Sequence, residues 1–172
     1  MKELISGLNL KQITIHIVAT LLLVIGLKQF SFLTDMEFTE HIITKQRQID
    51  ELGNGTERLA SLLIWIEVSR MVGFAISGLI MFQLTRKLKY FWINVLIVLL
   101  SGYLITRLEL FNSDVIKKVT LFPGRLFSKA GPFYPYLING LFLTGLALLV
   151  FYNGRIKQFI GIQQNQIPEI SK

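Results

Sequence analysis

The sequence predicts an all-α integral membrane protein with four transmembrane helices and an amphipathic outer-surface helix between the first two. Three observations lead to this fold class. Of the 172 residues, 52% are hydrophobic and only 17% are charged, a composition too apolar for a soluble domain of this size. The apolar residues gather into four blocks of about 20, near the length that crosses a ~30 Å hydrocarbon layer. The basic residues lie mostly just outside these blocks, where they would meet lipid phosphates.

The four predicted spans cover residues 13–33, 59–84, 91–111 and 133–152. The first holds an 11-residue run, 17–27, that resembles the core of a signal peptide. No small-residue cleavage site follows this run, so we interpret the segment as an uncleaved anchor. Residues 1–155 are expected to form a single four-helix transmembrane domain, followed by a short cytoplasmic tail at 156–172.

The outer segment at 34–58 has the pattern of a helix that lies along the membrane surface. Thr34 and Glu37 have the spacing of a capping box. Apolar residues then recur at helical spacing, at Phe38, Ile42, Ile49 and Leu52. The glycines at 53 and 55 are expected to supply the positive φ angles of a helix end, and Asn54 or Thr56 would cap the second span.

The outer segment at 112–132 alternates Lys and Arg with Leu, Val and Phe. This alternation suits a chain lying among lipid headgroups, with Pro123 and Gly124 turning it back on itself. An ordinary connecting loop whose apolar residues cover the helices explains the pattern equally well.

Basic residues in short loops predict the orientation of the chain. The link between the second and third spans is a few residues long and carries Arg86, Lys87 and Lys89. The two sides hold nearly equal numbers of basic residues, so the prediction rests on the density of this one loop. It places the amino and carboxyl termini in the cytoplasm, and the composition favours a bacterial inner membrane.

The most informative residues are charged groups inside the predicted spans, namely Lys28, Glu67, Arg70, Arg107 and Glu109. Ionisable groups within a bilayer are costly and are treated first as functional. At 1.5 Å per residue, the antiparallel spans place all five in the outer half of the bilayer. The sequence therefore predicts an intramembrane charge cluster.

Helical spacing suggests how these charges pair. Glu67 and Arg70 are three residues apart and can pair within one helix, while Arg107 matches Glu67 in depth. The polar face of the third span favours pairing between Arg70 and Glu109. The alternatives are a structural pair at 67 and 70, and boundary residues that reach towards the headgroups.

Small residues in the second span form a stripe that permits close approach of another helix. The stripe consists of Ser69, Gly73 and Ser77.

The motifs of several function classes are missing from the sequence. There is no cysteine, and the two histidines are too few for a dihaem bundle or a three-ligand zinc site. No phosphate loop, HExxH or GxSxG motif occurs, and no span contains an aspartate. We therefore predict no catalytic residue, no metal and no cofactor. The net charge of +7 is assigned to lipid headgroups, and nucleic acid is not expected as a partner.

Three hypotheses of function follow. The first is a non-catalytic accessory or scaffold subunit, acting with a membrane protein partner or as a homo-oligomer. The second is a transporter, a channel or an anionic-lipid-binding protein that uses the charge cluster. The third is an enzyme acting on a lipid, with Glu67 or Glu109 as the base, and it lacks a clear second catalytic group.

Overall fold

The computed structural model describes residues 8–44, 49, 52–108 and 114–161, and within these residues it contains helices and no strand. Three helices are long and apolar enough to cross a membrane, namely α2 (Leu10–Ser31), α4 (Gly55–Thr85) and α8 (Phe133–Tyr152). A fourth apolar helix, α5 (Phe91–Arg107), has 17 residues. The predicted helical class and membrane character are confirmed to this extent.

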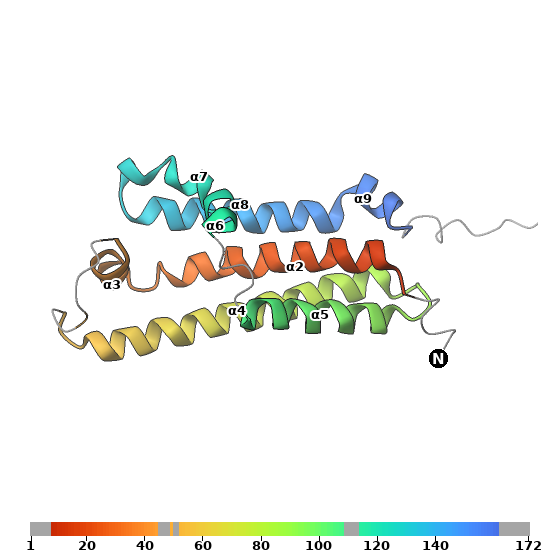
Figure 1. The fold of residues 1–172 in the computed structure, drawn as a ribbon, viewed down its shortest axis with the longest axis horizontal. Helices are drawn as coiled ribbons and strands as arrows, with labels where there is room; N and C mark the ends of the chain where they lie inside the picture. Colours follow the sequence, from red (N-terminus) through yellow and green to blue (C-terminus); the bar gives the residue numbers. More distant parts are fainter. Residues whose placement is uncertain (1–7, 45–48, 50–51, 109–113, 162–172) are drawn as a thin grey trace, which may run out of the picture.

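The helix α2 lies between α8 on one side and α4 and α5 on the other (Figure 1). Gly73 of α4 is so close to α2 that a Cβ atom there would lie 3.1 Å from the Cα of Val24. Further along, the Ser69 hydroxyl hydrogen-bonds the Ser31 hydroxyl at 2.7 Å, so α4 runs antiparallel to α2. On the other side of α2, a Cβ at Gly26 would meet the backbone nitrogen of Thr144 at 2.9 Å.

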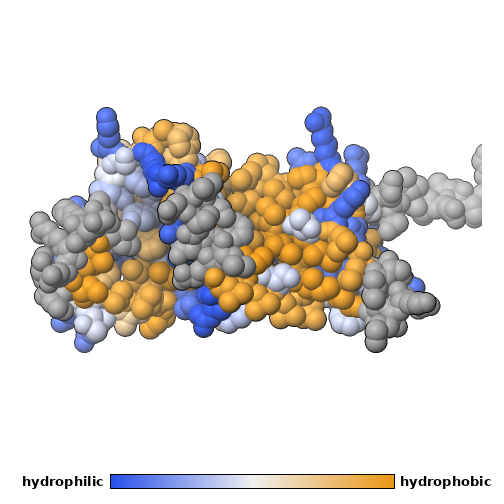
Figure 2. Space-filling model, viewed as in Figure 1, coloured by the Kyte–Doolittle hydropathy of each residue, from blue (hydrophilic) through white to orange (hydrophobic). Residues whose placement is uncertain are grey.

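The surface of α4, α5 and α8 is apolar where it faces away from α2. In the most apolar stretch of α2, 50% of the residues are buried inside the protein. The corresponding share is 11% in α4 and 22% in α8. On α5 the outward residues recur every four positions, at Trp92, Leu96, Leu100, Leu104 and Leu108. Figure 2 shows hydrophobic residues covering most of the middle of one face, with hydrophilic side chains at its margins. Such a surface is typical of contact with lipid rather than water.

The first helix begins earlier than predicted because Asn9 caps it. The Asn9 side chain accepts a hydrogen bond from the backbone N–H of Gln12 at 3.1 Å, so α2 starts at Leu10. The chain then forms α3 (Met36–Thr39) and the π-helical turn η1 (Glu40–Thr44). The predicted capping box is wrong, since Asp35 is the N-cap of α3 and the Thr34 hydroxyl instead donates to the Ser31 carbonyl. Residues 45–48 and 50–51 of the predicted surface helix lie outside the described residues.

Two residues in left-handed conformation set the starts of α4 and α5. Asn54 has φ 57° and Tyr90 has φ 58°. The expectation that Gly53 or Gly55 supplies the positive φ is wrong. Asn54 is the N-cap residue of α4, as one of the two predicted candidates, but its side chain makes no cap hydrogen bond. With Asn54 turning the chain, α4 begins at Gly55, four residues before the predicted start at Leu59.

The carboxyl-terminal helices follow the prediction in part. The bounds of α8 coincide with the predicted span at 133–152. The segment before it forms α6 (Asp114–Thr120), α7 (Phe122–Arg125) and the 3-10 turn η3 (Ser128–Ala130). Pro123 and Gly124 lie within α7 rather than in a separate turn, since a proline is tolerated in the first turn of a helix. The short helix α9 (Gly154–Phe159) follows α8.

Candidate functional site: a cation-lined pocket

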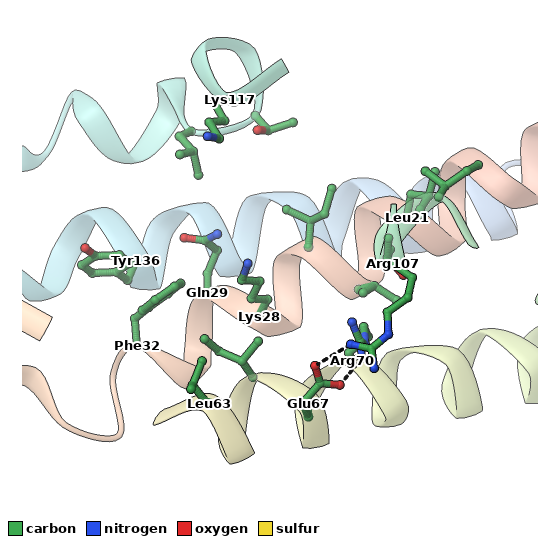
Figure 3. Close-up of a pocket in the computed structure, with 17 residues that line it drawn as sticks. Leu21, Lys28, Gln29, Phe32, Leu63, Glu67, Arg70, Arg107, Lys117 and Tyr136 are labelled. Carbon is green, nitrogen blue, oxygen red and sulfur yellow. Dashed lines mark hydrogen bonds and ion pairs between the residues drawn. The ribbon is translucent and has the colours of Figure 1, made fainter. Parts of the chain in front are cut away.

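A pocket of about 580 Å³ opens between α2, α4, α5 and the α6–α7 segment (Figure 3). Its lining is partly apolar, with Leu21, Ile25, Leu63, Ile66 and Ile105 among the contributing residues. The same pocket is lined by four cationic side chains, Lys28, Arg70, Arg107 and Lys117, and by the carboxylate of Glu67. The cavity therefore combines hydrocarbon walls with an excess of positive charge.

Glu67 pairs with two arginines (Figure 3). The guanidinium of Arg70 donates a hydrogen bond to Oε2 of Glu67, one helical turn away. Nη1 of Arg107, on α5, lies 3.7 Å from Oε1 of Glu67. The side chain of Arg70 is 13% exposed, whereas that of Arg107 is 58% exposed. The structure thus contains both of the pairs that were expected for Glu67.

Arg70 faces a different side of α5 than the sequence suggested. Its guanidinium carbon lies 5.8 Å from the ring centroid of Tyr103, within the range of a cation–π interaction. Its Nε is buried and has no hydrogen-bond partner among the described residues. The residue that was expected to face Arg70, Glu109, lies outside the described residues. The helix register instead turns Tyr103 and Arg107 towards α4.

Lys28 and Gln29 contribute from α2, and Lys117 contributes from α6 (Figure 3). Gln29 is only 7% exposed. Neither lysine forms a salt bridge with an acidic group in the part of the chain that the structure describes. Sequence reasoning placed Lys117 in an outer segment and did not connect it with the cluster. The alternation of basic and apolar residues in that segment was the sequence pattern that could have indicated a role for Lys117.

The α6–α7 segment is fixed to α8 beside this pocket. The backbone N–H of Gly124 donates to Oδ1 of Asn139 at 2.7 Å. Gly124 is required for this approach, because a Cβ there would lie 2.5 Å from Nδ2 of Asn139. Leu121, which precedes α7, also lines the pocket. The segment predicted to be either a surface chain or a covering loop therefore packs against α8 and covers one edge of the site.

A second group of ion pairs joins the start of α3 to the start of α4. Arg58 donates to Asp35 from Nε at 2.7 Å and from Nη2 at 2.5 Å, and Nη2 also lies 2.9 Å from Glu37. The hydrogen bond from Arg58 lowers the pKa of Asp35 below its usual value, and the backbone N–H of Phe38 adds to this effect. The Asp35–Arg58 pair therefore holds α3 against α4.

Within the described residues no group of three or more His, Asp or Glu side chains is placed to hold a metal ion. The fold and the pocket define a class: an all-helical protein with three helices apolar enough to span a membrane and a cation-lined cavity between its helices. No protein-family model matches this chain, and no curated protein or solved structure is detectably similar to it.

Proposed function

We propose that this chain is a multi-pass membrane protein in which α5 forms a fourth span and the pocket binds the headgroup of an anionic lipid. One observation carries the proposal. Four cationic side chains and one carboxylate line a cavity that also has hydrocarbon walls, which leaves three positive charges in excess among its described residues. An anion attached to an acyl chain satisfies both parts of this lining.

The charges fit a phosphate group in their chemistry. Arg70 and Arg107 offer planar guanidinium groups, which suit phosphate oxygens, and Lys28 and Lys117 offer flexible ammonium groups. Glu67 acts as the counter-ion of both arginines. A bound phosphate would share the guanidinium donors with Glu67.

The topology follows from the antiparallel order of the helices. If α2, α4, α5 and α8 all cross the bilayer, the amino and carboxyl termini lie on one side together with the basic residues at 86–89. At 17 residues α5 is about 25 Å long, slightly less than the ~30 Å hydrocarbon layer, and Arg107 at its end would reach the headgroups. A bacterial inner membrane remains the proposed location.

The accessory or scaffold role, which was the first hypothesis from the sequence, stays a prediction. The exposed apolar faces of α4 and α5 would touch lipid in the proposed arrangement, so they give it no separate support.

The test compares thermal unfolding of the purified protein in micelles that contain either phosphatidylcholine or phosphatidylglycerol. We expect phosphatidylglycerol to raise Tm, because a ligand that binds only the folded state stabilises it by RT ln(1 + [L]/Kd). Lys28→Gln and Arg107→Gln should lower this response, whereas the matched control Lys87→Gln, in the loop between α4 and α5, should retain it. An equal response in all three variants would exclude the pocket as the lipid site.

A further inference from the structure

A second group of polar side chains lies in the interior, away from the pocket. Five of them come from three helices, and each is at most 3% exposed, namely Gln12, His16, Thr20, Ser77 and Asn94. Each has at least one buried nitrogen or oxygen atom without a hydrogen-bond partner among the described residues. For Gln12, both the amide oxygen and the amide nitrogen are buried and have no hydrogen-bond partner among the described residues.

Helix register places these side chains at successive levels of the interior, and we call this group the polar column. Gln12, His16 and Thr20 follow one another at intervals of four residues, which is about 6 Å along α2, and so lie on one side of it. A Cβ at Gly102 of α5 would lie 3.7 Å from Cγ2 of Thr20. Because α5 runs parallel to α2, Asn94 lies at the level of Gln12, eight residues earlier in both helices.

The helix α4 completes the column from its own side. Gly73 packs against Val24, and α4 is antiparallel to α2, so Ser77 lies at the level of Thr20. The ring of His16 contacts the ring of Phe151 on α8, with centroids 5.6 Å apart. The polar column is therefore enclosed by all four long helices.

Unpaired polar atoms are not stable in a dry interior. Each loses its hydration on burial and gains no hydrogen bond in return. Five such side chains together would cost a free energy comparable to the whole stability of a small domain. Buried polar groups in native proteins are almost always bonded to protein or to ordered water.

We propose that this column is an internal water-binding site. Ordered water molecules bridge Gln12, His16 and Asn94 at one end and Thr20 and Ser77 at the other. This site is distinct from the cation-lined pocket and does not depend on what the pocket binds.

One apolar layer separates the two polar compartments. Val24 lines the pocket and packs against Gly73, while Thr20 and Ser77 lie one helical turn below these two residues. The Val24–Gly73 contact thus closes the water site against the pocket. Removing the methyl groups of Val24 would connect the two compartments.

Hydration is tested on the unmodified protein by X-ray pulse labelling, in which hydroxyl radicals form from water beside a side chain. Phe151, which contacts His16, and Phe38 are both 1% exposed, which makes them a matched pair. Met81, one helical turn after Ser77 on α4, is 0% exposed. We expect Phe151 and Met81 to be labelled and Phe38, away from the column, to remain unlabelled. Labelling of Phe151 and Met81 no greater than that of Phe38 would overturn the water site.

The separating layer is tested with a thiol probe, since the chain has no cysteine. In Ser77→Cys, we expect a small methanethiosulfonate reagent to react about tenfold faster when Val24→Ala is added, because truncation opens the layer. Val98→Ala is the matched control, since Val98 is also buried but lies outside the layer. Equal rates in the Val24→Ala and Val98→Ala backgrounds would overturn the role of the Val24–Gly73 contact. Circular dichroism and Tm establish that each variant is folded.

Discussion

The carboxylate of Asp35 both caps α3 and binds Arg58. Because its folded-state pKa is lowered, the charged form stabilises the fold. This contribution is complete above the ordinary pKa of an aspartate and is lost as the pH falls through the lowered folded value. We therefore expect Tm to fall in acid, as followed by circular dichroism, with part of this decrease caused by Asp35.

Two variants separate the roles of Asp35. Asp35→Asn keeps a good N-cap and loses the charge, so we expect a smaller acid-induced decrease of Tm than in the wild type. Asp35→Ala also loses the cap and should cost a further ~1 kcal/mol at neutral pH. An unchanged pH profile in Asp35→Asn would show that other carboxylates cause the decrease.

Glu67 neutralises Arg70, whose side chain is 13% exposed. We expect Glu67→Gln to lower Tm in phosphatidylcholine micelles, because it leaves a largely buried guanidinium without its counter-ion. In phosphatidylglycerol the same variant should recover stability, since the lipid phosphate replaces the lost carboxylate. The measurement is Tm in both lipids.

The control for this prediction is Glu57→Gln, which removes a carboxylate from the exposed first turn of α4. The change in Tm that Glu57→Gln causes should be the same in phosphatidylcholine and in phosphatidylglycerol. A loss of stability in Glu67→Gln that phosphatidylglycerol does not reverse would indicate a purely structural pair.

At the scale of the helices, the stripe of small residues on α4 allows its contact with α2. Ser69 hydrogen-bonds Ser31, Gly73 packs on Val24, and Ser77 is fully buried. We expect Gly73→Val to destabilise the protein by about 1–3 kcal/mol, because the added atoms would force the backbones apart. Unfolding monitored by circular dichroism gives the difference.

Gly145→Val is the matched control, since it makes the same substitution at an exposed position of α8 where an added Cβ would have no atom within 4 Å. Its stability should stay close to that of the wild type. Equal losses in Gly73→Val and Gly145→Val would show that packing of Gly73 against α2 is not responsible.

At the scale of the whole molecule, the proposed four spans predict that both termini lie on one side of the membrane. The cysteine-free chain allows single thiols to be introduced at Ser6→Cys, Ser171→Cys and Lys87→Cys. In intact cells, an impermeant maleimide should leave all three unlabelled, and permeabilised cells should label all three. Labelling of one terminus alone in intact cells would mean that α5 does not cross the bilayer.

Much of this architecture could be read from the sequence. Long apolar runs predict helices in lipid because every backbone N–H and C=O must be paired within the segment. The bounds of α8 were predicted on this basis. The helix ends were predicted less well, because they depend on single residues such as Asn9, Asp35 and Asn54, and similar neighbours could have served.

The sequence by itself determined the helical class and the apolar blocks, since these follow from composition. It also indicated that Glu67 can pair with Arg70 and Arg107, since this follows from 3.6 residues per turn and 1.5 Å per residue. Only the tertiary structure decided which helix lies inside and that Lys117 joins the pocket. It also decided that Tyr103, rather than Glu109, faces Arg70. The physical reason is that rotation and sliding of one helix against another are set by side-chain packing across the interface, such as Gly73 on Val24 and Gly124 on Asn139, and periodicity within one helix does not contain this information.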